Sequence, residues 1–500
     1  MSNIWSTVAV PGAFRSAAGE SESARPFDTA KDVAGVLLLA ALAAYTVVSG
    51  SPIVRLVLAG GIAASIIALF DVRPRYGLLA LLIYLPLVAL IRRFLIPYVG
   101  WTTNDPLLLV APAVAGFSMI RLFVVEHRRF AADRLSYLVC ALLAMVVIAS
   151  LNPRNGSPAV GLGGLLFMGV PVLWFLIGRE YLDRRTTLTV VTMLIPMAVV
   201  ISGYGFFQSL VGLPSWDLAW VEIADYTALY LERDVTNTFA TFASTAEYTL
   251  YMGVAIAAAV ALALHGRTWT LIALPAILPA IFLSSSRTGF VFTLIAVAVM
   301  VVMRFSSPRR APWILLACVG AIAFGSPAIT SALQAGAQQT GDARVEYQLS
   351  GLGDPLNREQ STVMLHWEIL VRGVKSGLTD PIGRGSGVTN NAIRRLGPGG
   401  ENAVGQNTEV DISDAFVSMG LFGGLIFLAL LVTGIRYAVK VYARDRDGLS
   451  LAILGILVVT FGNWLSGGHY AVTPLIWLLL GWTAAVRLRP AVPRQPSVAR

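Results

Sequence analysis

Seven arginines and lysines gather in residues 327–412 of this 500-residue chain, together with one histidine and a closing acidic run. Guanidinium groups bind oxyanions through a planar pair of donors, and a carboxylate or imidazole can take a proton from a hydroxyl. The sequence therefore predicts an aqueous site in this stretch. The candidate bases are His366, Glu409, Asp411 and Asp414. The alternative is that the acids only cap a helix and that the histidine is an interfacial packing residue.

Arg287 is the other conspicuous charge. It stands in the run 284–289, which interrupts residues 268–303, a stretch with no other charge. An arginine at a membrane boundary costs about 2.5–3.5 kcal/mol unless it is paired or hydrated. This predicts an anion anchor, and the alternative is a hairpin turn with an arginine that reaches the interface.

Residues 357–377 predict an amphipathic helix in the hydrophilic stretch. Apolar side chains fall on one face, while Arg358 and Arg372 lie close together on the opposite face. Such a helix rests on a membrane or caps a cavity. His366 lies beside Trp367 at the edge of the apolar face.

The glycine-rich run 380–387 follows this helix. No strand precedes it and no Lys-Ser/Thr pair follows it, so it does not fit a P-loop or dinucleotide site. It predicts a tight turn that presents backbone N–H groups and Arg384 to an anion. No cluster of His, Cys and Asp has the spacing of metal ligands, so no metal or other cofactor is expected.

Apolar helices in a membrane must position these residues. The chain is 56% hydrophobic and only 13% charged, whereas soluble domains average about 25% charged residues. We therefore predict an all-α polytopic membrane protein with about 12–14 transmembrane helices. The predicted spans are 33–50, 53–70, 76–92, 106–125, 135–151, 160–178, 187–212, 248–265, 268–284, 288–304, 312–326, 413–435, 450–466 and 470–487.

Basic residues predict the orientation of these spans. With the amino terminus inside, cytoplasmic connectors and tails hold 24 of the 37 lysines and arginines. The formal charge of +9 is thus explained by the cytoplasmic edge, and nucleic-acid binding is not expected. The predicted organisation is a cytoplasmic arm (1–32), about eleven helices (33–326) with a shorter outside loop at 213–247, a large outside loop (327–412), about three helices (413–487) and a cytoplasmic tail (488–500).

The order of these features resembles the O-antigen ligase and O-antigen polymerase superfamily of bacterial cell-envelope proteins. Residues 233–248 resemble that family's arginine, threonine-rich turn and re-entering helix, and residues 284–289 resemble its Ser-Arg-Gly-like hairpin. The run from His366 through 380–387 to the glycines at 420–424 is similar to its loop signature and the helix after it. The resemblance covers about residues 187–435.

This resemblance implies transfer of a glycan from undecaprenyl pyrophosphate at the outer face of the bacterial plasma membrane, without a cofactor. It implies that pyrophosphate is bound by Arg233, Arg287, Arg358, Arg372 and Arg384, and that a carboxylate deprotonates the acceptor hydroxyl. The implied partners are the lipid-linked glycan, membrane lipid and other polysaccharide-assembly proteins such as a flippase and a chain-length regulator.

One stretch departs from the family pattern. The family ends its long loop with a His-Asn pair, whereas residues 407–411 contain no histidine. This favours a polymerase with an acidic base, and a ligase is the alternative. A lipid-linked oligosaccharide flippase would also explain the helices and Arg287, but it has no need of an outside loop of this length.

Overall fold

The computed structural model describes residues 53–128, 133–224, 229–232, 235–307, 310–354, 363–397, 410–465 and 469–488. The first half contains α2 (Val54–Val72), α3 (Pro74–Tyr84), η1 (Leu85–Leu87), α4 (Val88–Phe94), α5 (Ile96–Val99), η2 (Pro106–Leu109), α6 (Val110–Ile120), η3 (Arg121–Val125), α7 (Arg134–Ser150), η4 (Pro153–Asn155), α8 (Pro158–Gly164), η5 (Leu165–Gly169), α9 (Val170–Tyr181), α10 (Arg184–Leu210) and α11 (Ser215–Ala224). The second half contains β1 (Tyr230–Glu232), β2 (Val235–Thr236), α12 (Thr245–Ala263), η7 (Thr268–Ala273), α13 (Leu274–Leu283), α14 (Arg287–Phe305), α15 (Ala311–Gln339), α16 (Ala343–Gly353), α17 (Val363–Thr379), α18 (Ala392–Leu396), α19 (Asp411–Asp445), α20 (Gly448–Val459) and α21 (Val472–Leu488).

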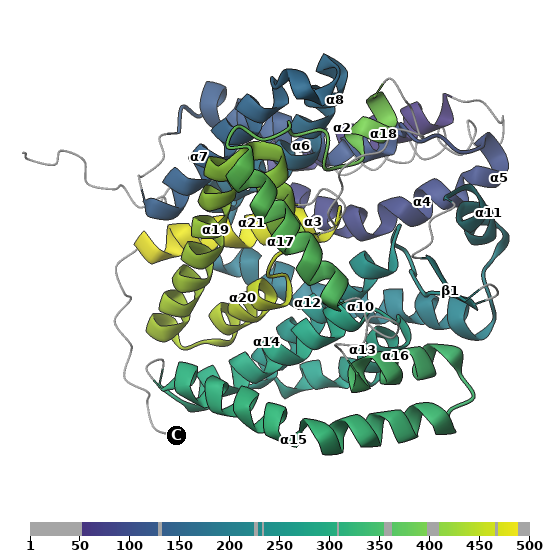
Figure 1. The fold of residues 1–500 in the computed structure, drawn as a ribbon. Helices are drawn as coiled ribbons and strands as arrows, with labels where there is room; N and C mark the ends of the chain where they lie inside the picture. Colours follow the sequence, from purple (N-terminus) through teal and green to yellow (C-terminus); the bar gives the residue numbers. More distant parts are fainter. Residues whose placement is uncertain are drawn as a thin grey trace, which may run out of the picture.

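Helices account for nearly all of this architecture (Figure 1). Within the described residues, eight helices are long and apolar enough to cross a membrane, and four shorter helices are also apolar. Every predicted span from 53–70 onward overlaps a helix, while the predicted span 33–50 lies outside the described residues. The protein is an all-α, multi-pass membrane protein. The strands β1 and β2 form only a small antiparallel hairpin.

Three helices form the centre of the bundle. Nearly all side chains of α12, α20 and α21 are buried, as expected for helices that are apolar on every side. α21 lies against α9 through glycines of both helices. A Cβ on Gly178 would lie 2.1 Å from the carbonyl oxygen of Leu478, and one on Gly481 would lie 2.0 Å from that of Phe175. These helices therefore pack backbone to backbone.

The hydrophilic stretch is itself largely helical. α15 continues to Gln339, past the predicted end of its span at residue 326, because the alanines and glutamines that follow favour a helix. α16 then folds back along α15, as Figure 1 shows at its lower edge. α17 packs along the first part of α19, where Gly420 breaks the helix with φ of 69°.

Polar contacts between connectors fall into two sets. One set contains Arg154–Asp380, Arg93–Asp217 and the hydrogen bonds from Arg344 to the Thr236 carbonyl. The other contains Arg121–Asp71, Arg179–Asp133 and Arg184–Asp447. Each of these contacts joins connectors that the count of basic residues assigns to the same side of the membrane. We call the side that carries residues 343–354 and 363–397 the loop face.

Candidate functional site

Arg287 begins α14, directly after a tight turn. Ser285 adopts φ of 61° in this turn, and the hydroxyl of Ser284 lies 2.7 Å from that of Thr249 in α12. Gly289 also rests on Thr249, where a Cβ would lie 2.5 Å from the threonine Cγ2. The turn is therefore pressed against the first turns of α12.

The guanidinium of Arg287 is held by α16. It donates a 2.5 Å hydrogen bond to the Tyr347 carbonyl, and its Cζ lies 3.7 Å from the centre of the Tyr347 ring. Gly351, one turn later, leaves the room it occupies, since a Cβ there would lie 1.9 Å from the same Cζ. The side chain is half-buried. The hydrophilic stretch thus fixes the orientation of this membrane-boundary arginine.

The connector between α20 and α21 joins three elements on the loop face. The Leu465 N–H donates to Asp411 Oδ2 at 2.6 Å, and the Ala471 N–H donates to Glu247 Oε1 at 2.7 Å. The Tyr470 hydroxyl donates to the Leu108 carbonyl. Asp411 begins α19 and Glu247 lies in the first turn of α12. These two buried acids are therefore connected through one short segment.

His469 lies in the same connector. Its Nδ1 is buried and has no hydrogen-bond partner among the described residues. Desolvation by burial lowers the pKa of His469 to about 4, so the imidazole is neutral at ordinary pH.

α17, which carries the predicted site residues His366 and Arg372, packs on the start of α19. Gly373 lies against Ser413, whose hydroxyl donates to the Ile369 carbonyl at 3.2 Å. His366 precedes Gly373 by seven residues and so shares the α19-facing side of α17, while Arg372 is exposed. Asp414, in the first turn of α19, is buried. The predicted residues His366, Arg372, Asp411 and Asp414 therefore lie on two helices that touch.

The glycine-rich turn at 380–387 packs between α19 and the end of α7. The N–H groups of Arg384 and Gly385 donate to the Val417 and Ser418 carbonyls, just before the break in α19. Those of Ser386 and Gly387 donate to the Ala149 carbonyl and to Asn155. The prediction that these N–H groups bind an anion is wrong, because protein acceptors already use them. The side chain of Arg384 is half-buried.

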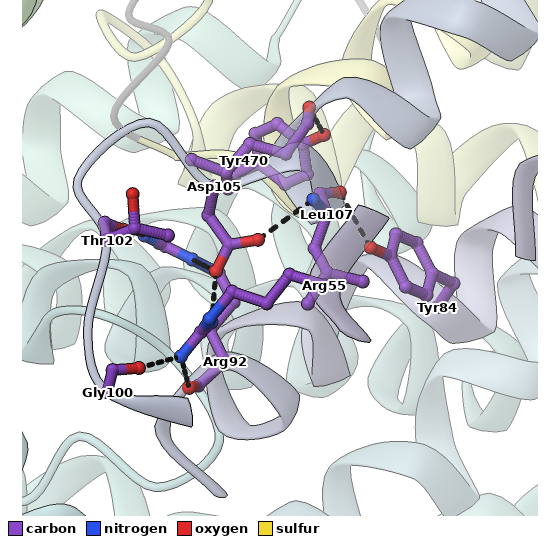
Figure 2. A network of polar contacts seen from close by, with 9 residues as sticks. Arg55, Tyr84, Arg92, Gly100, Thr102, Asp105, Leu107 and Tyr470 are labelled. Atoms are coloured by element: carbon purple, nitrogen blue, oxygen red, sulfur yellow. Dashed lines mark hydrogen bonds and ion pairs between the residues drawn. The ribbon is translucent and has the colours of Figure 1, made fainter. Parts of the chain in front are cut away.

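A second basic cluster lies on the loop face, formed by helices near the start of the described chain. Arg55 and Arg92 both bind Asp105 in a buried network that also holds backbone carbonyls, and Tyr470 reaches the same region (Figure 2). Arg92 stacks on the Trp101 ring at 4.3 Å. Arg395 of α18 is within electrostatic range of Asp105, and burial lowers its pKa. Sequence patterns did not indicate this cluster.

Arg233, Arg358 and Glu409 lie outside the described residues. Arg287 belongs to the α14–α16 side of the loop face, and His366, Arg372, Asp411 and Asp414 belong to the α17–α19 side. The contacts above link these two groups through α12, which carries Glu247, and through the α20–α21 connector. Glu247 was not predicted from the sequence. Its signal was a Ser-x-x-Glu pattern, residues 244–247, at the start of an apolar run.

Comparison with known proteins finds a family that matches part of the chain. The sequence profile of the family described as O-antigen ligase matches residues 270–428, about a third of the chain. The matched segment runs from η7 through the Arg287 turn, α16 and α17 into the first part of α19. No curated protein matches the chain. The match over residues 270–428 thus supports the O-antigen ligase and O-antigen polymerase superfamily.

Proposed function

We propose that this protein transfers a glycan from undecaprenyl pyrophosphate to a glycan acceptor, as an O-antigen or exopolysaccharide polymerase. The observation that carries the proposal is Arg287, a half-buried arginine in the family-matched segment, with its guanidinium oriented by Tyr347. We place the loop face outside the bacterial plasma membrane and both termini in the cytoplasm, as the basic residues predict.

The proposed glycan transfer depends above all on neutralising the charge of the departing pyrophosphate. Attack of an acceptor hydroxyl on the anomeric carbon displaces a pyrophosphate that is already highly charged. Oriented arginines stabilise such a group without a metal ion. Arg287 is the first candidate for this role, followed by Arg233, Arg358, Arg372 and Arg384. The candidates for taking the acceptor proton are Asp411, Asp414, Glu409 and His366.

A ligase is the second candidate. The matched family is described as O-antigen ligase, and His366 lies on the side of α17 that faces α19. This histidine would be available to a ligase although residues 407–411 lack one. The acceptor separates the two functions, since a polymerase extends a glycan and a ligase transfers it to another acceptor such as a lipid.

Purified protein supplied with undecaprenyl-pyrophosphate oligosaccharide tests the proposal. We expect turnover that persists in EDTA. Arg287→Lys keeps the charge but loses the planar fork, so we expect loss of most activity at near-normal protein levels. If Arg287→Ala turned over at the wild-type rate, residues 284–289 would be only a hairpin turn, without a role in binding the donor. Transport of the donor across vesicle membranes without transfer would favour a flippase.

A further inference from the structure

We propose that Glu247 is the general base of the reaction and that the acceptor sugar lies across the amino-terminal end of α12. The inference deepens the proposed function and rests on it. It assigns the proton to a residue outside the family-matched segment.

Glu247 departs from the usual role of its sequence pattern. Ser244 caps α12, and its Oγ accepts the Glu247 N–H at 3.2 Å, which is one half of a capping box. In a complete capping box the glutamate reaches back to the N–H of the capping serine. Here Oε1 instead accepts from Ala471, 224 residues away in sequence. The carboxylate therefore points toward the α20–α21 connector.

The environment of the Glu247 carboxyl group is energetically unfavourable, which argues against a purely structural role. Glu247 is 3% exposed and forms no ion pair with any described lysine or arginine. One backbone N–H is its only side-chain hydrogen bond within the described residues. A buried carboxylate without a cation is destabilising, and ionisable groups at membrane depth mark functional sites.

Three hydroxyl groups near the same end of α12 have no hydrogen-bond partner among the described residues. Thr241, Thr245 and Ser285 are each at least nine-tenths buried, and each has a hydroxyl oxygen without a hydrogen-bond partner among the described residues. Thr241 and Thr245 flank the start of α12, and Ser285 belongs to the turn packed on Thr249. Buried polar groups normally have partners. A sugar, which is rich in hydroxyl groups, supplies them.

Two sides of α12 face the two parts of the proposed site, the Arg287 turn and the α20–α21 connector. Thr249 faces the turn that carries Arg287, whereas Glu247, two residues earlier, faces the connector. The helix between them is about 10 Å across. A donor with its pyrophosphate at Arg287 can therefore present its anomeric carbon at the end of α12. There the acceptor oxygen bonds to that carbon, the carbon–oxygen bond to pyrophosphate breaks with its electron pair, and the acceptor proton passes to Glu247.

The full-length protein with undecaprenyl-pyrophosphate oligosaccharide as donor tests this assignment. Glu247→Gln retains an oxygen that accepts from Ala471 but cannot take a proton. We expect wild-type donor binding and melting temperature, with turnover slower by about 10²–10⁴-fold. Formate should restore part of the turnover of Glu247→Ala. The exposed Glu222→Gln, on α11, is the matched control and should behave as wild type.

Other outcomes overturn the assignment. If Glu247 only fastens the connector, Glu247→Gln turns over within a few-fold of wild type. If Asp411→Asn or Asp414→Asn binds donor without turnover while Glu247→Gln remains active, the base lies on α19. If the wild type transfers no glycan from any such donor, the proposed function fails and this assignment fails with it, whereas an active wild type beside an active Glu247→Gln contradicts the assignment alone.

Discussion

A guanidinium group selects phosphate by geometry only when its planar fork is held in one orientation. For Arg287 that orientation comes from two uncharged residues. Tyr347 covers one face of the group, and Gly351 leaves the space in which the group lies. The arginine was predictable because it is an isolated charge, but its partners lie 60 residues and more along the chain and carry no hydropathy signal.

Gly351→Ala should therefore impair the enzyme without touching a charged residue. The new Cβ would lie 1.9 Å from Cζ of Arg287, so the guanidinium must move. We expect weaker donor binding and at least about tenfold lower turnover, since misplacement by about 1 Å can cost 10²-fold. Gly341→Ala is the control, because a Cβ there has no neighbour within 4 Å. Equal turnover in both variants would show that Arg287 does not depend on this contact.

Glu247 illustrates what sequence reading misses at the scale of a residue. Its Ser-x-x-Glu pattern correctly indicates the start of a helix, and Ser244 does cap α12. The pattern cannot reveal that the carboxylate binds Ala471, because the connector reaches α12 only through tertiary packing. Local signals identify the helix end and leave the long-range partner undetermined.

At the scale of elements, α17 shows how small residues decide docking. The sequence predicts an amphipathic helix, and its apolar side chains Trp367, Val371 and Leu378 are exposed in the structure. The face that packs on α19 is instead lined by Gly373 and Gly377, which lie against Ser413 and Phe416. The exposed apolar side chains stay available for the membrane surface, which remains a prediction.

Gly373→Ala distinguishes an α17 that is exposed at this position from an α17 that is docked on α19. On an exposed helix the change should stabilise by about 0.5–1 kcal/mol. At this site a Cβ would lie 1.8 Å from Ser413 Oγ, so we expect the opposite sign, with a lower melting temperature and reduced turnover. Lys375→Ala, on the exposed side, should change neither quantity. A higher melting temperature for Gly373→Ala would mean that α17 is not docked on α19.

Helix positions followed from hydropathy, but helix ends and breaks did not. α20 ends at Val459, seven residues before the predicted end of its span, and Gly462 follows with φ of 87°. The break at Gly420 is likewise invisible to hydropathy, because the residues around it are apolar. A Cβ on Gly420 would lie 2.0 Å from the Pro381 carbonyl oxygen, so the glycine at the break leaves room for the turn at 380–387.

At the scale of the whole molecule, the two sets of polar contacts agree with connectors on two faces. Which face is outside is predicted from basic residues alone. Cysteine labelling in intact spheroplasts decides this, in a background with Cys140 and Cys318 replaced by alanine. Asn391→Cys, on the loop face, should react with an impermeant thiol reagent, and Ser307→Cys, on the opposite face, should not. Both positions are exposed. The reverse pattern would invert the topology.

The α20–α21 connector also has a consequence for biosynthesis. It bonds to residues that precede it by 54, 224 and 362 positions, so it is made after nearly all of the helices that it ties together. Until α21 enters the membrane, Glu247 and Asp411 lack these backbone partners. A partly synthesised chain therefore cannot complete the loop face. If the proposed function holds, the order of synthesis itself keeps an unfinished protein from consuming lipid-linked sugar.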